Sequence, residues 1–183
     1  MSGWQVLEAV VRVAVGGVLV AAGLAKLRAG RTSLLRAVLA YDMAGPRLSA
    51  MVSRALPATE VAVGAALMLG AATRPMAVAA TGLFALFTVV VAVTLLRGKR
   101  VPCNCFGFAR RSAAVRWSML ARNAVLISAA LFVHRLAADH GAGPWSVDGV
   151  VGPGGEVRSG LVLAAIGVAV AATARTVARR ASG

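Results

Sequence analysis

The chain has 183 residues, of which 59% are hydrophobic and 14% are charged, and its formal net charge is +14. In soluble domains about a quarter of all residues are charged, so this composition excludes an ordinary water-soluble fold. In a chain this apolar the arginines are expected to set membrane orientation, so no nucleic-acid partner is predicted.

Apolar windows about as long as a hydrocarbon core is thick, roughly 17 to 25 residues, recur along the chain. They cover about residues 5–26, 57–73, 75–96, 117–137 and 159–178. None shows the alternation of apolar and polar residues that marks a membrane barrel, so the backbone must be satisfied within helices. The sequence predicts an all-α, polytopic transmembrane bundle of about five helices, forming a single domain over residues 1–183. Its four-helix core spans about 5–138, and a C-terminal anchoring helix spans about 159–178.

The first window resembles a secretory signal in being apolar and in starting at the N-terminus. It lacks a basic front end and carries Glu8 instead, so we expect a retained helix in which Glu8 pairs with Arg12. Residues 32–41 then have the apolar spacing of a short amphipathic helix lying in the membrane interface. Pro57 suits the first turn of the next helix, where a missing N–H costs nothing.

The basic residues are distributed unevenly between the connecting segments. Segments 28–54 and 97–116 and the arginines of the C-terminal tail fall on one side of the predicted bundle, whereas acidic residues gather on the other. The positive-inside rule therefore predicts five crossings of the cell inner (plasma) membrane, with the N-terminus outside and the C-terminus in the cytoplasm.

The chain has two cysteines, Cys103 and Cys105, in the loop before the fourth membrane helix. Pro102, Asn104 and Gly107 favour the sharp turn that would bring such close thiols into disulfide geometry. The pair can be a redox centre, but inert apolar fillers, a static disulfide and half of a metal site are alternatives. Zinc needs further ligands, so no metal is predicted.

Among the ionisable residues inside or at the ends of the apolar windows are Lys26, Glu60 and Arg122. Charge is costly there, so function is the default hypothesis. The predicted topology puts all three on the cysteine side. Pairing of Glu60 with Lys26 or Arg122 would fix helix register. Surplus positive charge would also favour a thiolate, the form that attacks disulfides. Asn123, beside Arg122, is expected to bridge helices or orient a loop carbonyl.

Several separated segments resemble the methylamine utilisation protein MauE family, which groups with the wider DoxX-like membrane proteins. They are Gly23-Leu24-Ala25-Lys26-Leu27, Leu56-Pro57 with Glu60, Gly64 with Leu67-Met68-Leu69-Gly70, Cys103-Asn104-Cys105-Phe106-Gly107, and Arg122-Asn123. The Cys-x-Cys-Phe-Gly segment is the most specific. The resemblance covers about residues 10–130.

This resemblance implies a membrane component of thiol–disulfide exchange that acts with a thioredoxin-like protein. The implied client is the disulfide-rich small subunit of methylamine dehydrogenase, or another disulfide-containing protein. No bound cofactor is predicted, but the chain has no second cysteine pair, so thiols elsewhere or a membrane quinone must complete the electron path. Whether the chain is itself an enzyme stays open. The alternatives are a non-catalytic assembly or scaffold subunit and, less favoured, a small-molecule transporter.

Overall fold

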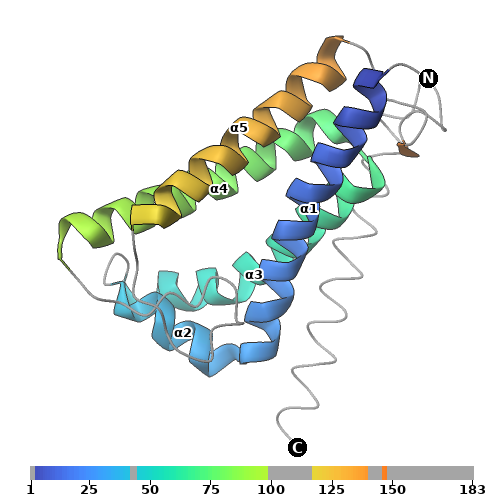
Figure 1. The fold of residues 1–183 in the computed structure, drawn as a ribbon. Coiled ribbons are helices and arrows are strands. Elements are labelled where there is room, and N and C mark those ends of the chain that lie inside the picture. Colours follow the sequence, from blue (N-terminus) through green and yellow to red (C-terminus); the bar gives the residue numbers. More distant parts are fainter. Residues whose placement is uncertain (1–2, 42–44, 99–116, 140–145, 148–183) are drawn as a thin grey trace, which may run out of the picture.

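The fold is a bundle of helices, and the computed structural model describes residues 3–41, 45–98, 117–139 and 146–147 of it. The long helices are α1 (Gly3–Ala29), α3 (Pro46–Leu69), α4 (Thr73–Leu96) and α5 (Trp117–Asp139), and the short α2 (Arg31–Ala40) joins α1 to α3 (Figure 1). The all-α prediction is confirmed. All four long helices have the length and hydropathy needed to cross a membrane. The predicted window at 159–178 lies outside the described residues.

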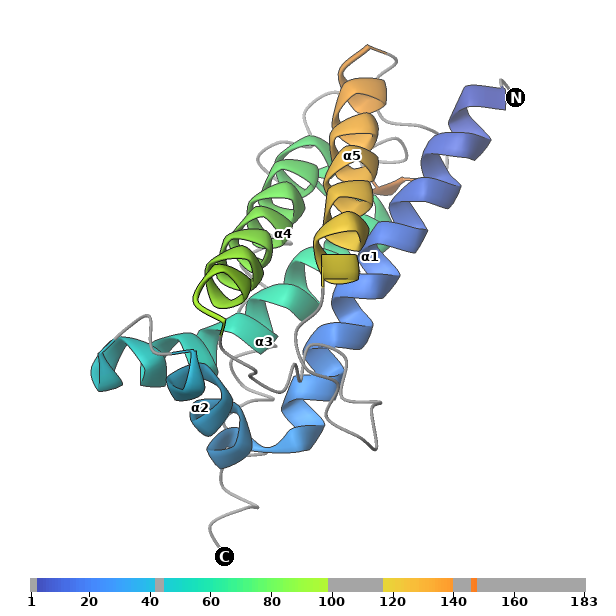
Figure 2. The same ribbon diagram turned by 60° about the vertical axis from the view of Figure 1, so that its left-hand side comes forward.

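The long helices form two closely packed pairs, α1 with α3 and α4 with α5. Figures 1 and 2 show α4 and α5 side by side from both directions, with α2 lying beyond the end of α1. Between the pairs, buried side chains from all four helices form one core, which includes Leu19, Leu67, Phe84 and Val133. Other large apolar side chains remain exposed, such as Val125, which is 67% exposed, and these would face lipid.

Glycines bring the backbones of α1 and α3 into contact. A Cβ added at Gly16 would lie 2.6 Å from the carbonyl oxygen of Gly64, and one added at Gly64 would lie 2.6 Å from that of Gly16. Farther along the same antiparallel crossing, a Cβ at Gly23 would lie 2.8 Å from the carbonyl oxygen of Pro57. Membrane helices use small residues for such close approach because packing replaces the hydrophobic drive. This crossing turns the last part of α1, which carries Lys26, toward α3.

The start of α3 differs from the sequence prediction. Pro57 was expected in the first turn, but Pro46 occupies that place and Pro57 lies buried inside the helix. Helix-forming apolar residues between the two prolines extend the helix toward its N-terminus, and a membrane helix tolerates an internal proline when its neighbours pack against it. As a consequence Glu60 lies well inside α3 and not in its first turn.

The other helix predictions within residues 3–139 agree with the structure to within a few residues. The amphipathic helix expected at 32–41 is α2, and the windows at 5–26, 75–96 and 117–137 fall within α1, α4 and α5.

Candidate functional site

A buried ion pair joins α1 to α3. Lys26 in the last turn of α1 places its Nζ 2.5 Å from Oε1 of Glu60, and the two side chains are 7% and 0% exposed. The ammonium donates a hydrogen bond to the carboxylate. Burying two charges is costly, and only mutual attraction at close range offsets the lost hydration. The pair therefore fixes the relative position of two membrane helices.

Lys26 also contacts the second helix pair. Its Nζ lies 5.1 Å from the centroid of the Phe87 ring on α4, which is within the range of a cation–π interaction. The second oxygen of Glu60, Oε2, is buried and has no hydrogen-bond partner among the described residues. The ammonium is thus held between a carboxylate of α3 and an aromatic face of α4.

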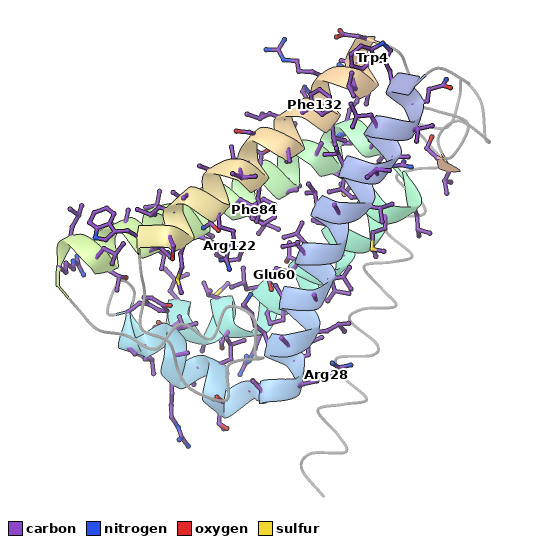
Figure 3. All side chains as sticks on the ribbon, in the orientation of Figure 1. Trp4, Arg28, Glu60, Phe84, Arg122 and Phe132 are labelled. Atoms are coloured by element: carbon purple, nitrogen blue, oxygen red, sulfur yellow. The ribbon has the colours of Figure 1, made fainter. Side chains whose placement is uncertain are left out.

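Lys26 lines a small pocket between α1, α4 and α5. The pocket has a volume of about 30 Å³, and its polar lining comes from Lys26, Arg122 and Asn123. Its apolar lining comes from Val18, Leu19, Ala22, Phe84, Phe87, Val91 and Leu126. Arg122 Nη2 lies 3.4 Å from Asn123 Oδ1, to which it donates, and Asn123 is buried. Figure 3 shows Arg122 of α5 and Glu60 of α3 within the space between the two helix pairs.

The size and charge of this pocket limit what it can hold. A buried water needs at least about 10–15 Å³ of cavity volume and a benzene ring about 150 Å³, so there is room for one or two waters or a similarly small polar group and not for an enclosed cofactor ring. Lys26 and Arg122 both contribute a cationic side chain to the pocket lining, and Lys26 is paired with Glu60. Donors of this kind suit a small anion or a hydrogen-bond acceptor.

The structure brings together four residues that the sequence singled out. Lys26 and Glu60 form the ion pair, and Arg122 and Asn123 share the pocket with Lys26. The predicted Cys103 and Cys105 lie outside the described residues. The role of Phe87 was missed, because a phenylalanine in an apolar window carries no signal that separates a cation partner from ordinary core.

A second ionic contact lies near the opposite end of α1. Arg12 Nε is 3.5 Å from Glu8 Oε1, as the spacing predicted, and Arg12 is only 1% exposed. Its guanidinium occupies the space that a side chain at Gly70 would need, beside Ser146. The Arg12 guanidinium thus packs against the C-terminal end of α3, away from the pocket. Among the residues the structure describes, no group of three His, Cys, Asp or Glu side chains is placed to hold a metal ion.

Comparison with known proteins gives a consistent result. Residues 4–136 match the family model described as methylamine utilisation protein MauE. Over 86 residues the chain is 35% identical to the methylamine utilization protein MauE of Paracoccus denitrificans, an alignment that covers 46% of either protein. It is 36% identical to the protein of the same description from Paracoccus versutus, over 45% of either. The chain thus spans about half the length of the curated relatives it matches. No solved structure matches it.

Proposed function

Because this chain belongs to the methylamine utilisation protein MauE family, we propose that it is a membrane component of thiol–disulfide exchange. The four apolar helices and the family make it a multi-pass membrane protein. In the proposed function Cys103 and Cys105 alternate between dithiol and disulfide in exchange with a thioredoxin-like partner. The client is a disulfide-containing protein of methylamine utilisation, such as the dehydrogenase small subunit, or an equivalent protein elsewhere.

The observation that carries this proposal is the pocket lined by two cationic side chains, Lys26 and Arg122, beside the helix ends that flank the cysteine segment. Arg122 and Asn123 lie in the second turn of α5, and Val91 lies less than two turns before the end of α4. Cys103 follows the last described residue after α4, Gly98, by five residues, a length of chain that extends at most about 17 Å. This length limits how far Cys103 can lie from the end of α4, and we propose that a cysteine approaches Arg122 within that reach. A cation near a thiol favours the thiolate.

The exchange step itself needs only the two cysteines and a partner disulfide. One thiolate attacks a sulfur of the partner, a mixed disulfide forms, and the partner's other sulfur leaves as a thiolate that takes up a proton. The second cysteine then attacks the mixed disulfide, so this chain is oxidised to its disulfide and the partner is reduced to a dithiol. The reverse sequence oxidises the partner, and the same pocket would favour the attacking thiolate in either direction.

Repeated turnover in the oxidising direction needs an acceptor for two electrons and two protons. We propose a membrane quinone, which becomes a quinol as the dithiol of Cys103 and Cys105 becomes a disulfide. A pocket of about 30 Å³ is too small for a quinone ring, so contact with the quinone would occur outside it.

The rate at which the thiols are alkylated tests the electrostatic part of the proposal. At pH 7 this rate follows the thiolate fraction, and removing one nearby cation shifts that fraction by up to about tenfold. Arg122→Gln should therefore slow alkylation of the reduced protein about three- to tenfold. Arg135→Gln, which removes an exposed arginine from the far end of α5, is the matched control and should leave the rate unchanged. Equal alkylation rates in wild type and Arg122→Gln would show that the charge of Arg122 does not raise the thiolate fraction of the cysteines.

We also propose that the helix ends carrying Lys26 and Arg122 face the cytoplasm and that the N-terminus lies outside. The reason is that the basic segments 28–54 and 97–116 connect the helices at the end that carries Lys26 and Arg122. An impermeant maleimide added to sealed cells should then fail to label the reduced cysteines. Strong labelling from outside would reverse the orientation.

A scaffold subunit is the second candidate function. Two contacts favour a scaffold function, because they would hold the bundle together independently of the cysteines. They are the ion pair of Lys26 with Glu60 and the close approach of Gly16 to Gly64. The two functions differ in one outcome: a scaffold tolerates replacement of both cysteines by serine, and an exchange component does not.

A further inference from the structure

The end of the bundle that holds α2 is strongly basic. Five exposed arginines lie there, at the end of α1, along α2 and in the first half of α3, and we call them the basic end: Arg28, Arg31, Arg36, Arg47 and Arg54. Figure 3 shows Arg28 at the corner where α1 meets α2. Between Glu8 and Glu60 the sequence contains a single acidic residue, Asp42. This stretch of the sequence therefore carries many more basic than acidic residues.

The first half of α3 has two distinct sides. Arg47, Met51 and Arg54 follow each other at intervals of four and three residues, so they form one stripe along the helix. Met51 is 66% exposed and its neighbour Leu48 is 53% exposed. The opposite stripe, which includes Ser49 and Ser53, is buried. The exposed side thus combines cations with large apolar side chains.

The short helix α2 has the same combination. Leu34 is its one buried residue, whereas Arg31 and Arg36 are exposed and Leu39 is 42% exposed. Because α2 connects two membrane helices directly, its position is close to the membrane boundary. Apolar side chains exposed at that depth meet acyl chains, and arginines at that depth meet headgroups.

We propose that the basic end is a binding surface for anionic phospholipids. The guanidinium groups of Arg31, Arg36, Arg47 and Arg54 hold lipid phosphates, for which the planar fork of arginine is well suited. Leu48 and Met51 contact the upper parts of the acyl chains. An acidic soluble protein would match the charge but would leave these apolar side chains without an apolar partner, so the exposed Leu48 and Met51 favour lipid. This assignment does not depend on the thiol chemistry.

Lipid binding by the purified full chain tests the proposal. The protein in a mild non-ionic detergent is titrated with phosphatidylglycerol or phosphatidylcholine, and bound lipid is counted by native mass spectrometry. Wild type should bind phosphatidylglycerol at least about tenfold more tightly, since each arginine near a membrane surface contributes about fivefold. Arg47→Gln with Arg54→Gln should reduce that preference at least about fivefold, and Arg47→Lys with Arg54→Lys should keep most of it.

The matched control removes the same charge from the other end of the bundle. Arg74 and Arg135 are exposed there, and replacing both by Gln should leave the preference unchanged. Raising the salt to about 1 M, which screens charges beyond about 3 Å, should weaken the preference of the wild-type protein for phosphatidylglycerol. Because this measurement uses no substituted protein, misfolding of a variant cannot explain its result. Equal binding of both lipids by wild type, as expected if an acidic protein were the true occupant, would overturn the proposal. So would an equal loss in the control variant.

Discussion

The ion pair of Lys26 with Glu60 predicts strong energetic coupling between α1 and α3. Three variants test it: Glu60→Leu, Lys26→Met and the combination of both. Each single substitution removes one charge and leaves the other buried, whereas the combination replaces the pair with apolar side chains of similar length. The expected result is two severely destabilised single variants and a combined variant close to wild type.

The structure sets the magnitudes. Breaking a buried pair costs about 3–5 kcal/mol, because an uncompensated charge stays behind. In Glu60→Leu the remaining ammonium keeps the Phe87 ring at 5.1 Å and still lines the pocket, so the loss should be near the lower limit, about 3 kcal/mol. In Lys26→Met the remaining carboxylate is 0% exposed, so the loss should be near about 5 kcal/mol. The combined variant should differ from wild type by no more than about 2 kcal/mol, because apolar replacements of buried pairs are often neutral.

The free energy of unfolding of each variant can be measured in bicelles by steric trapping. Arg135→Met removes an exposed arginine from the far end of α5 and serves as the control, with a change within about 0.5 kcal/mol. If the loss in the combined variant equals the sum of the two single losses, the two charges are energetically independent, which contradicts the predicted coupling between α1 and α3.

Three further predictions use the same unfolding assay. Gly16→Ala should cost about 1–3 kcal/mol, because its Cβ would meet backbone at 2.6 Å, whereas Gly17→Ala next to it meets nothing within 4 Å and should cost nothing. Gly70→Ala and Gly98→Ala both place a side chain at positive φ and should each cost at least about 1 kcal/mol, but Gly70→Ala should cost clearly more because a guanidinium fills the space. Phe87→Leu should cost about 0.5–2 kcal/mol in the wild-type background, where Lys26 lies over the ring. In the Lys26→Met background the same substitution should cost much less.

Much of the bundle could be predicted from the sequence, because a membrane helix is defined by length and hydropathy alone. The start of α3 could not. Arg47 and Arg54 lower the hydropathy of its first half, and Pro57 resembles a helix start, so the predicted window began at residue 57 and not at Pro46. The helix continues because the lost backbone hydrogen bond at Pro57 is a local cost that packing against α1 offsets.

The pairing within the site was predictable in kind but not in detail. The cost of an isolated charge required a partner for Glu60, and both Lys26 and Arg122 were candidates. The choice of Lys26 depends on the glycine contacts that orient α1 against α3, and the local sequence does not specify which helices make such long-range contacts. The placement of Arg12 against Gly70 was unpredictable for the same reason, although its spacing from Glu8 predicted the ion pair.

The most direct test of the proposed exchange function is to trap the mixed disulfide. Cys103→Ser and Cys105→Ser each leave one thiol, so the variant that lacks the resolving cysteine should accumulate a covalent adduct with its partner. On non-reducing gels of membranes, one of the two variants is expected to show a band shift that disappears on adding reductant, and the double serine variant is expected to show none. Absence of an adduct from both single variants, together with full formation of the client's disulfides by the double variant, would contradict thiol exchange and leave the scaffold function.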